Sequence, residues 1–262
     1  MFSETHCHLT RLTQDARIRT IAQAEKLGVE LVLDAGVDPE SSRLAIENAR
    51  EQPIIRACVG LHPWHADRYN DEVLKRLDEL ARHPEVVAVS EIGLDYVGRR
   101  DRDGKFVNEF TDKGVQQSAF RNQLRIAAKS GLPVIVHDST PGQEVLDILQ
   151  EEDSPATGVA IHGFSKDSTY AKRCEEMGIY LSIGLRMITS KDNEAFKETL
   201  KQIPLSTLLT ETDSRDPEGV LTVAKQIAEL KGLSTEHVAL TTTQNLRKLI
   251  RRRECGNHTS AT

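Results

Sequence analysis

The chain has 262 residues, of which 38% are hydrophobic and 28% charged, and this length can bury a substantial core in one α/β barrel or in two smaller domains. Its formal net charge of −6 at pH 7 argues against a nucleic-acid binder with an overall basic surface. No apolar run approaches the roughly 18 to 20 residues of a membrane span, and the first residues are polar rather than signal-like. We therefore expect a soluble, cytoplasmic protein with no membrane contact.

Short apolar runs recur along the chain and are separated by helical patterns. After a short first strand expected at "THCHL", apolar runs begin at Glu30, Ile54, Val86, Pro133, Gly158, Ile179 and Ser206. Their nearly continuous apolar character is typical of parallel strands covered on both faces. The intervening segments, such as residues 220–227, carry apolar side chains at the spacing of an amphipathic helix.

Eight strands, each followed by a helix candidate, predict a parallel α/β architecture that closes into a (β/α)8 TIM barrel. We assign residues 1–250 to this single domain and residues 251–262 to a polar C-terminal tail. A doubly wound open sheet is the rival fold, but no GxGxxG motif follows the first strand to support it. Residues 96–114 form a long loop expected on the active-site face, and we interpret their mixed charges as solvent-exposed.

Histidines and carboxylates collect at the ends of the predicted strands, where a TIM barrel carries its active site. In chain order these residues are His6, His8, His62, Glu91, His137, His162 and Asp213. In a strand, residues i and i+2 point to the same face, so His6 and His8 both face the mouth of the barrel. Five of the nine histidines fall at the ends of predicted strands, which is more than a random distribution along the chain would place there.

Neutral imidazoles and carboxylates together are suitable ligands for divalent cations. Six candidate ligands exceed the requirement of one tetrahedral site and suffice for two ions if Glu91 bridges them. We predict a first site formed by His6, His8, Asp213 and Glu91, and a second formed by Glu91, His137 and His162. The sequence leaves the metal open among Mg²⁺, Mn²⁺ and Zn²⁺.

Such a pair of cations, typically about 3.5 to 4 Å apart, lowers the pKa of a shared water and stabilises a displacement at phosphorus. Asp213, bound through one oxygen, can accept the proton of that water with the other. His62 lies near the expected site without being needed as a ligand, and it can orient a phosphate oxygen or protonate a leaving group. The candidate catalytic residues are therefore Asp213, Glu91 and His62, with a structural role beside Pro63 and Trp64 as the alternative for His62.

Several short segments combine these polar residues with distinctive neighbours: "THCHL", "GLHPW", "SEIGLDY", "LPVIVH", "HGFS", "TETDS" and "TTQNLRKL". In this order and spacing, from the N-terminus to about Ile250, they resemble the TatD-related family of metal-dependent deoxyribonucleases. The resemblance implies a TIM-barrel hydrolase with 3′→5′ exonuclease or DNase activity supported by divalent metal. It also implies metal ligands at His6, His8, Glu91, His137, His162 and Asp213.

The chain departs from that family at three positions. Glu4 stands where the family commonly has an aspartate, and Ser139 stands where it usually has an arginine two residues after the histidine. If that arginine holds a substrate phosphate in the family, this chain needs another cation. Arg186 and Arg215 are candidates for substrate binding together with His62, and Arg215 is itself a departure because the family often has a proline or small residue there.

We expect a divalent-metal-dependent hydrolase of phosphodiester bonds that acts on DNA, single-stranded or at strand ends, with a monomer as the favoured form. The 3′→5′ exodeoxyribonuclease mode rests on the resemblance alone. The first alternative is a binuclear-metal hydrolase of a small ester, amide, lactone or phosphoester, which would share every ligand. The second is a non-catalytic metal-binding barrel, which the complete ligand set disfavours.

Overall fold

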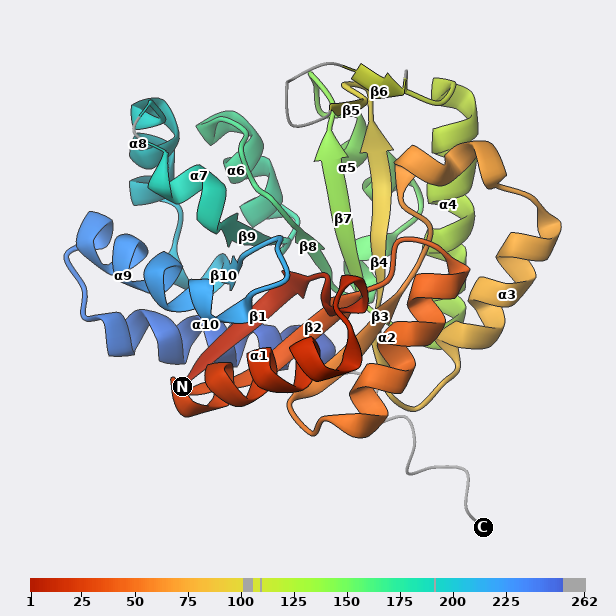
Figure 1. Cartoon of the computed structure of the whole chain (residues 1–262). Coiled ribbons are helices and arrows are strands. Elements are labelled where there is room, and N and C mark those ends of the chain that lie inside the picture. Colours follow the sequence, from red (N-terminus) through yellow and green to blue (C-terminus); the bar gives the residue numbers. More distant parts are fainter. Residues whose placement is uncertain (101–105, 109, 191, 252–262) are drawn as a thin grey trace, which may run out of the picture.

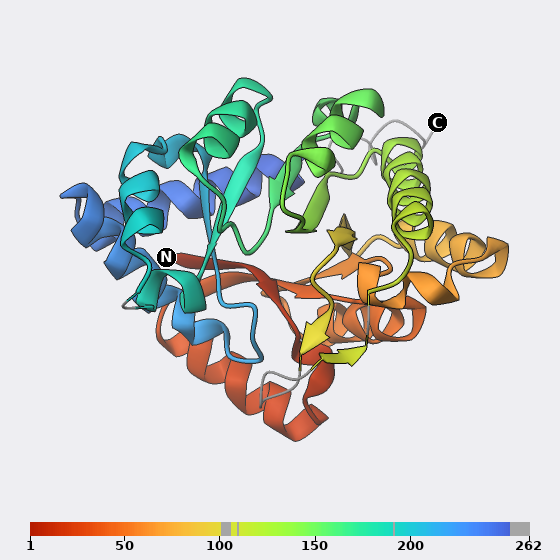
Figure 2. The same ribbon diagram turned by 90° about the horizontal axis from the view of Figure 1, so that it is seen from above.

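The structure is a computed structural model, and it describes residues 1–100, 106–108, 110–190 and 192–251. Eight parallel strands form one sheet in the order β1-β2-β3-β4-β7-β8-β9-β10. They span Phe2–Cys7 (β1), Val29–Ala35 (β2), Ile55–Val59 (β3), Val86–Asp95 (β4), Val134–Ser139 (β7), Val159–Ile161 (β8), Tyr180–Gly184 (β9) and Leu208–Glu211 (β10). Helices surround the strands on the outside (Figures 1 and 2).

The last strand returns to the first and nearly closes the sheet. The Thr210 hydroxyl on β10 donates a hydrogen bond to the Ser3 carbonyl on β1 at 2.8 Å. Just beyond β10, the Asp213 amide donates to the His6 carbonyl at 3.0 Å. The arrangement confirms the predicted (β/α)8 TIM barrel, and it places the carboxyl ends of all these strands on one face.

The helices begin and end where the sequence supplies caps. They span Gln14–Lys26 (α1), Pro39–Glu51 (α2), Asp71–Ala81 (α3), Lys113–Ser130 (α4), Glu144–Glu151 (α5), Ser168–Glu176 (α6), Leu185–Thr189 (α7), Glu194–Gln202 (α8), Val220–Lys231 (α9) and Thr235–Ile250 (α10). The Asp38 carboxylate caps α2 by accepting from the Ser41 amide at 2.8 Å. Gly131 and Gly232 end α4 and α9 with a φ of 64°, a left-handed conformation that glycine adopts without steric cost.

The main hydrophobic core lies between the strands and the surrounding helices. Phe120 of α4, Leu146 of α5 and Val223 of α9 are fully buried in one cluster with Val134 and Val136 of β7. Each helix therefore covers the outer surface of the barrel with its apolar face. The polar residues at the strand ends take no part in this packing and are left to form a site.

Two further features concern segments outside the barrel strands. The segment expected as a long loop after β4 contains a short antiparallel pair, Arg99–Arg100 (β5) and Phe106–Asn108 (β6). The proposed polar tail, residues 251–262, lies outside the described residues except for Arg251, which follows α10. Within the described part of the chain, every helix is too short or too polar to cross a membrane.

Candidate metal centre

Polar side chains from seven positions meet at the carboxyl end of the barrel. They are His6 on β1, His8 just after it, His62 after β3, Glu91 on β4, His137 on β7, His162 after β8 and Asp213 after β10. All are buried except His137, which is half-buried, and Asp213, which is exposed. The structure thus brings every residue of the two predicted metal sites into one cluster.

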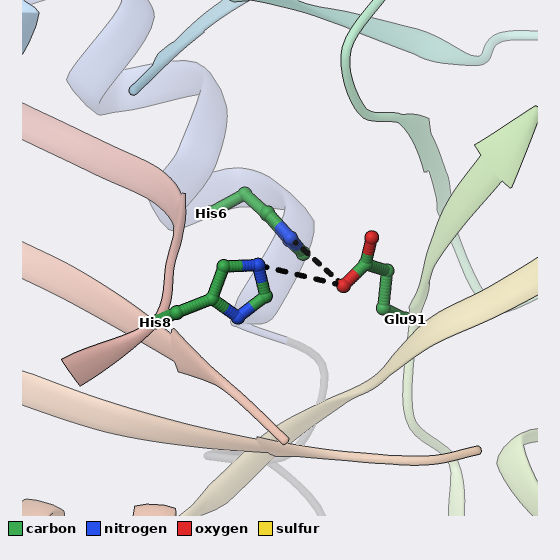
Figure 3. Close-up of side chains that lie close together, drawn as sticks. All are labelled: His6, His8 and Glu91. Atoms are coloured by element: carbon green, nitrogen blue, oxygen red, sulfur yellow. Dashed lines mark ion pairs between the residues drawn. The ribbon is translucent and has the colours of Figure 1, made fainter. Parts of the chain in front are cut away.

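The first group gathers around one oxygen of Glu91. His6 Nε2 lies 3.3 Å and His8 Nε2 lies 3.7 Å from Glu91 Oε2, and both imidazoles are directed at this oxygen (Figure 3). Asp213 Oδ1 lies 3.2 Å from His8 Nε2 and 3.9 Å from His6 Nε2. Asp213 has a φ of 49°, in a left-handed region that aspartate adopts more readily than most residues.

The second group surrounds the other oxygen of Glu91. His62 Nε2, His137 Nδ1 and His162 Nε2 lie 3.2, 3.4 and 3.1 Å from Glu91 Oε1. Glu91 therefore lies between the two groups with one oxygen directed at each, as a bridging carboxylate requires. The ligand atoms of His62, Glu91 and His137 are close enough to hold an ion together, so distance alone also admits His62 as a ligand.

Oxygen atoms lie behind three of the imidazoles, on the side away from Glu91. His8 Nδ1 donates to the Ala35 carbonyl at 3.3 Å, and His137 Nε2 lies 3.1 Å from Asp95 Oδ2. His162 Nδ1 lies 3.6 Å from Glu211 Oε1, which is too far for a hydrogen bond. In the neutral rings of His8 and His137, the outer nitrogen donates a hydrogen bond to a carbonyl or carboxylate oxygen, which leaves the lone pair of the inner nitrogen directed at Glu91.

His62 has the opposite arrangement. Its Nδ1 accepts a hydrogen bond from the Trp64 backbone amide at 2.9 Å, so in the neutral ring the proton is on Nε2, the atom that faces Glu91. Burial lowers the pKa of His62 to about 4, which keeps the ring neutral near pH 7. His62 is thus suited to donate a hydrogen bond into the site, and not to bind a metal.

Several buried atoms of the cluster fit a divalent cation. Within the described part of the chain, neither ring nitrogen of His6 nor Glu91 Oε2 makes a hydrogen bond. His137 Nδ1 and His162 Nε2, the nitrogens that face Glu91, lie 3.1 Å apart. Polar atoms buried without partners are costly, and a cation shared by imidazole and carboxylate ligands removes that cost. The donor set therefore fits the predicted metals.

The charges of the cluster depend on one another. Burial alone would raise the pKa of Glu91, but His62, His6 and His162 together hold it well below its usual value. Partial burial of its carboxylate likewise opposes ionisation of Asp213, and a hydrogen bond from Nε2 of protonated His8, whose own pKa is raised, overcomes it and lowers the pKa of Asp213 to about 2. Both carboxylates are therefore ionised at neutral pH.

Asp95, at the end of β4, supports the cluster from behind and was missed by the sequence reasoning. Its Oδ2 accepts from the Trp64 indole at 2.7 Å as well as lying beside His137. Its Oδ1 accepts from the amides of Val97 and Gly98 at 2.9 and 2.8 Å. A buried carboxylate at a strand end, inside the segment "SEIGLDY", is the signal that points to it.

Two more buried carboxylates lie beneath the ligands. Glu4 Oε1 accepts from the amides of His6 and Thr212 at 2.9 and 3.1 Å, so the longer side chain at this position supports the first ligand strand. Glu211 Oε1 accepts from the Gly163 amide at 2.6 Å beside His162. Glu211 was also missed, although it stands in "TETDS" two residues before a predicted ligand.

A cavity of about 600 Å³ opens over the cluster. It is lined by His8, Arg11, Val37, His62, Trp64, His65, Glu91, His137, Asp213 and Arg215. Arg215 thus reaches the cavity as the sequence predicted for a substrate contact. Arg186 is exposed on α7 and is absent from the described lining, whereas Arg11 lines the cavity and was missed.

Lys166 lies near Ser139, the position where the sequence lacks the expected arginine, but the charge of Lys166 is already paired. Lys166 Nζ lies 3.1 Å from Asp138 Oδ1, and the Tyr170 hydroxyl donates to the other oxygen of Asp138 at 2.6 Å. Asp138 directly precedes Ser139 on β7. Lys166 therefore stabilises the end of this strand and offers no free charge to the cavity.

The chain resembles known proteins over nearly its whole length. The family model described as TatD related DNase matches residues 4–251. The uncharacterised metal-dependent hydrolase YabD of Bacillus subtilis is 35% identical in a match that covers 96% of this chain and 99% of YabD. The 3′-5′ ssDNA/RNA exonuclease TatD of Cronobacter turicensis is 33% identical over 198 residues, which cover 76% of this chain and 72% of that protein.

A solved structure supports the same relationship. The crystal structure of YjjV, a TatD homologue from Escherichia coli, matches with a TM-score of 0.84 and 26% sequence identity. The match covers 95% of this chain and 98% of YjjV. The sequence and the fold therefore identify the same group of relatives.

Proposed function

This chain belongs to the TatD-related DNase family of metal-dependent hydrolases, and we propose that it cleaves phosphodiester bonds in single-stranded DNA or at strand ends, as a 3′→5′ exonuclease. The name of the Cronobacter relative supports this substrate and direction. The observation that carries the proposal is Glu91, whose two oxygens each face a separate group of ligand atoms. Such an arrangement is suited to two cations on a reacting phosphate.

The proposed ligands are the ones that the sequence predicts. His6, His8 and Asp213 share the first site with Glu91, and His137 and His162 share the second with the other oxygen of the same carboxylate. Divalent cations bound there would lower the pKa of a water molecule and stabilise negative charge on the phosphate. We infer two ions from this division of the ligands, with Mg²⁺, Mn²⁺ and Zn²⁺ as the candidates.

The protein supplies a proton acceptor and a hydrogen-bond donor. The ionised Asp213 carboxylate faces the cavity and is suited to accept the proton of the attacking water. His62 is neutral and carries its proton on the nitrogen that faces the cluster. It is therefore suited to orient a phosphate oxygen, which needs a donor, rather than to protonate a leaving group, which needs an imidazolium near pH 7.

The direct test is hydrolysis of a single-stranded DNA oligonucleotide labelled at its 5′ end, with each metal in turn and with a chelator control. A ladder of labelled products that shortens one nucleotide at a time, only when metal is present, is the expected result. Products cut at internal positions from the first time point would contradict the exonuclease mode. Absence of any product with all three metals would remove the nuclease proposal.

Substitution of the ligands tests the assignment of roles. His137→Ala and Glu91→Ala should each lower turnover by about 100-fold or more, because they remove a ligand that no neighbour replaces. His237→Ala is the matched control, since this histidine is exposed on α10 and lies outside the cavity lining. Far-ultraviolet circular dichroism should show that all three variants remain folded. Full activity in both ligand variants would contradict the proposed centre.

Ser139 favours one second candidate. Because the position commonly held by arginine in the family is a serine here, the site is also compatible with hydrolysis of a small ester, amide, lactone or phosphoester. The same metal-loaded preparation should be assayed on DNA, RNA and a panel of such small substrates. A small substrate turned over far faster than any oligonucleotide would favour this second function.

A further inference from the structure

Two arginines line the cavity from adjacent loops. Arg11 ends the 3₁₀ turn η1, Leu9–Arg11, just after β1, and Arg215 lies four residues beyond the end of β10. These loops are joined because the His8 amide donates to the Ser214 carbonyl at 2.8 Å. Both side chains line the cavity that holds the ligand cluster.

Within the described part of the chain, neither Arg11 nor Arg215 makes an ion pair or a side-chain hydrogen bond. Other arginines are paired, such as Arg17, which lies 2.7 Å from Glu51 Oε2. Lys166, another cation near this face, is paired with Asp138. An unpaired guanidinium beside a concave site is suited to bind an anion, because its planar donors match the oxygens of a phosphate.

Arg11 and Arg215 are more exposed than the buried ligands in the same cavity. The proposed ligands lie deep, since His6 and Glu91 are buried, whereas Arg11 and Arg215 are exposed at the rim on the β1–β10 side. A phosphate held at the ligand cluster already has cations to compensate its charge. The rim therefore offers a second anion site above the first, at one side of the same cavity.

We propose that Arg11 and Arg215 together bind the phosphate that neighbours the scissile one, so that the enzyme prefers a strand with consecutive phosphates over an isolated phosphodiester. This inference rests on the proposed phosphodiesterase function. It also gives the chain a replacement for the arginine that it lacks at Ser139. The ligand class is a nucleic-acid strand end that carries at least two phosphates.

Dinucleotides that differ in a single terminal phosphate test this site. The substrates are the thymidine dinucleotide dTpdT and its 5′-phosphorylated and 3′-phosphorylated forms, assayed with the active metal. One phosphorylated form should have a kcat/KM about 10-fold above that of dTpdT, mainly through a lower KM. The double variant Arg11→Ala/Arg215→Ala should abolish this preference, so that its kcat/KM is the same for all three dinucleotides and falls most for the preferred form.

The matched control is Arg19→Ala, which removes an exposed guanidinium from α1 outside the cavity lining and should preserve the preference. Equal kcat/KM values of the wild-type enzyme for all three dinucleotides would overturn the proposal. A double variant whose kcat/KM falls to the same extent for dTpdT and for both phosphorylated forms would also overturn the proposal. The arginines would then act on the scissile phosphate or on folding.

Binding without catalysis separates this inference from the proposed function. Trp64 is the single tryptophan of the chain and lines the cavity, so its fluorescence reports dinucleotide binding in the presence of a chelator. The double variant should bind the preferred phosphorylated form about 10-fold more weakly than the wild type, and Arg19→Ala should bind normally. Arginine-dependent binding here, together with no hydrolysis in the assay with metal, would reject the nuclease function and retain the phosphate site. Equal binding by all variants would reject the phosphate site.

Discussion

Asp95 illustrates how a residue outside the ligand set controls one inside it. Its carboxylate accepts hydrogen bonds from the Trp64 indole and from two backbone amides while it holds the outer nitrogen of His137. Four donors thus converge on two oxygens. The ring of a proposed ligand and one wall of the cavity are both oriented by this single side chain.

We predict that Asp95→Asn weakens metal binding by about 10- to 100-fold, a loss typical when a carboxylate behind a ligating histidine is replaced. An amide offers one accepting oxygen, so some of the donors that converge on residue 95 lose their partner. Isothermal titration calorimetry of metal into the metal-free protein measures the change. The control is Asp147→Asn on the exposed surface of α5, and an unchanged affinity in Asp95→Asn would contradict the positioning role.

At the scale of secondary-structure elements, the contact between β4 and β7 brings Glu91 close to His137. Gly93 of β4 is paired with His137 of β7, and a Cβ atom at residue 93 would lie 2.0 Å from the His137 carbonyl oxygen. Its φ of +141° is also rarely adopted by other residues. Only glycine allows the two ligand-bearing strands to approach this closely.

Gly93→Ala should therefore destabilise the protein by about 2 kcal/mol or more, because the strands must separate to admit a methyl group. Chemical denaturation monitored by circular dichroism measures the loss. Gly142→Ala is the matched control, since a Cβ atom there meets nothing within 4 Å and its stability should be nearly unchanged. A denaturation midpoint of Gly93→Ala equal to that of the wild type would show that β4 and β7 can separate without cost.

For the whole molecule, the ligand cluster connects the two ends of the chain and the middle strands. His6 and Asp213 come from opposite ends of the barrel sequence, and Glu91 comes from a strand between them. A cation that binds this cluster binds only the folded chain. Metal should therefore stabilise the entire barrel rather than one segment.

Saturating metal, at about 100 times its Kd, should stabilise the protein by about 2.7 kcal/mol, which corresponds to a rise in Tm of about 5 °C or more for a domain of this size. Differential scanning calorimetry with and without chelator measures the shift. Glu91→Gln preserves the volume of the side chain but removes the shared charge, so its Tm should respond much less to metal. An equal shift in both proteins would place the binding elsewhere.

Much of the architecture could be predicted from local sequence patterns. Apolar runs, helical periodicity and glycines at helix ends depend on neighbouring residues, and they predicted the eight-stranded barrel that the structure confirms. The candidate ligands were also accessible, because strand ends in a barrel meet on one face regardless of their separation in the chain. Histidines and acids at those ends were therefore predicted to be neighbours.

Only the tertiary structure decided how these residues face one another. The proton position on His62 depends on the Trp64 amide, and the role of Asp95 depends on which donors surround it. Arg11 and Arg215 line the same cavity because β10 returns to β1. Hydrogen bonds and ion pairs act over a few ångströms of space. Sequence by itself therefore determined which chemical groups reach the rim of the barrel, while the closure of the barrel decided their partners and hence their roles.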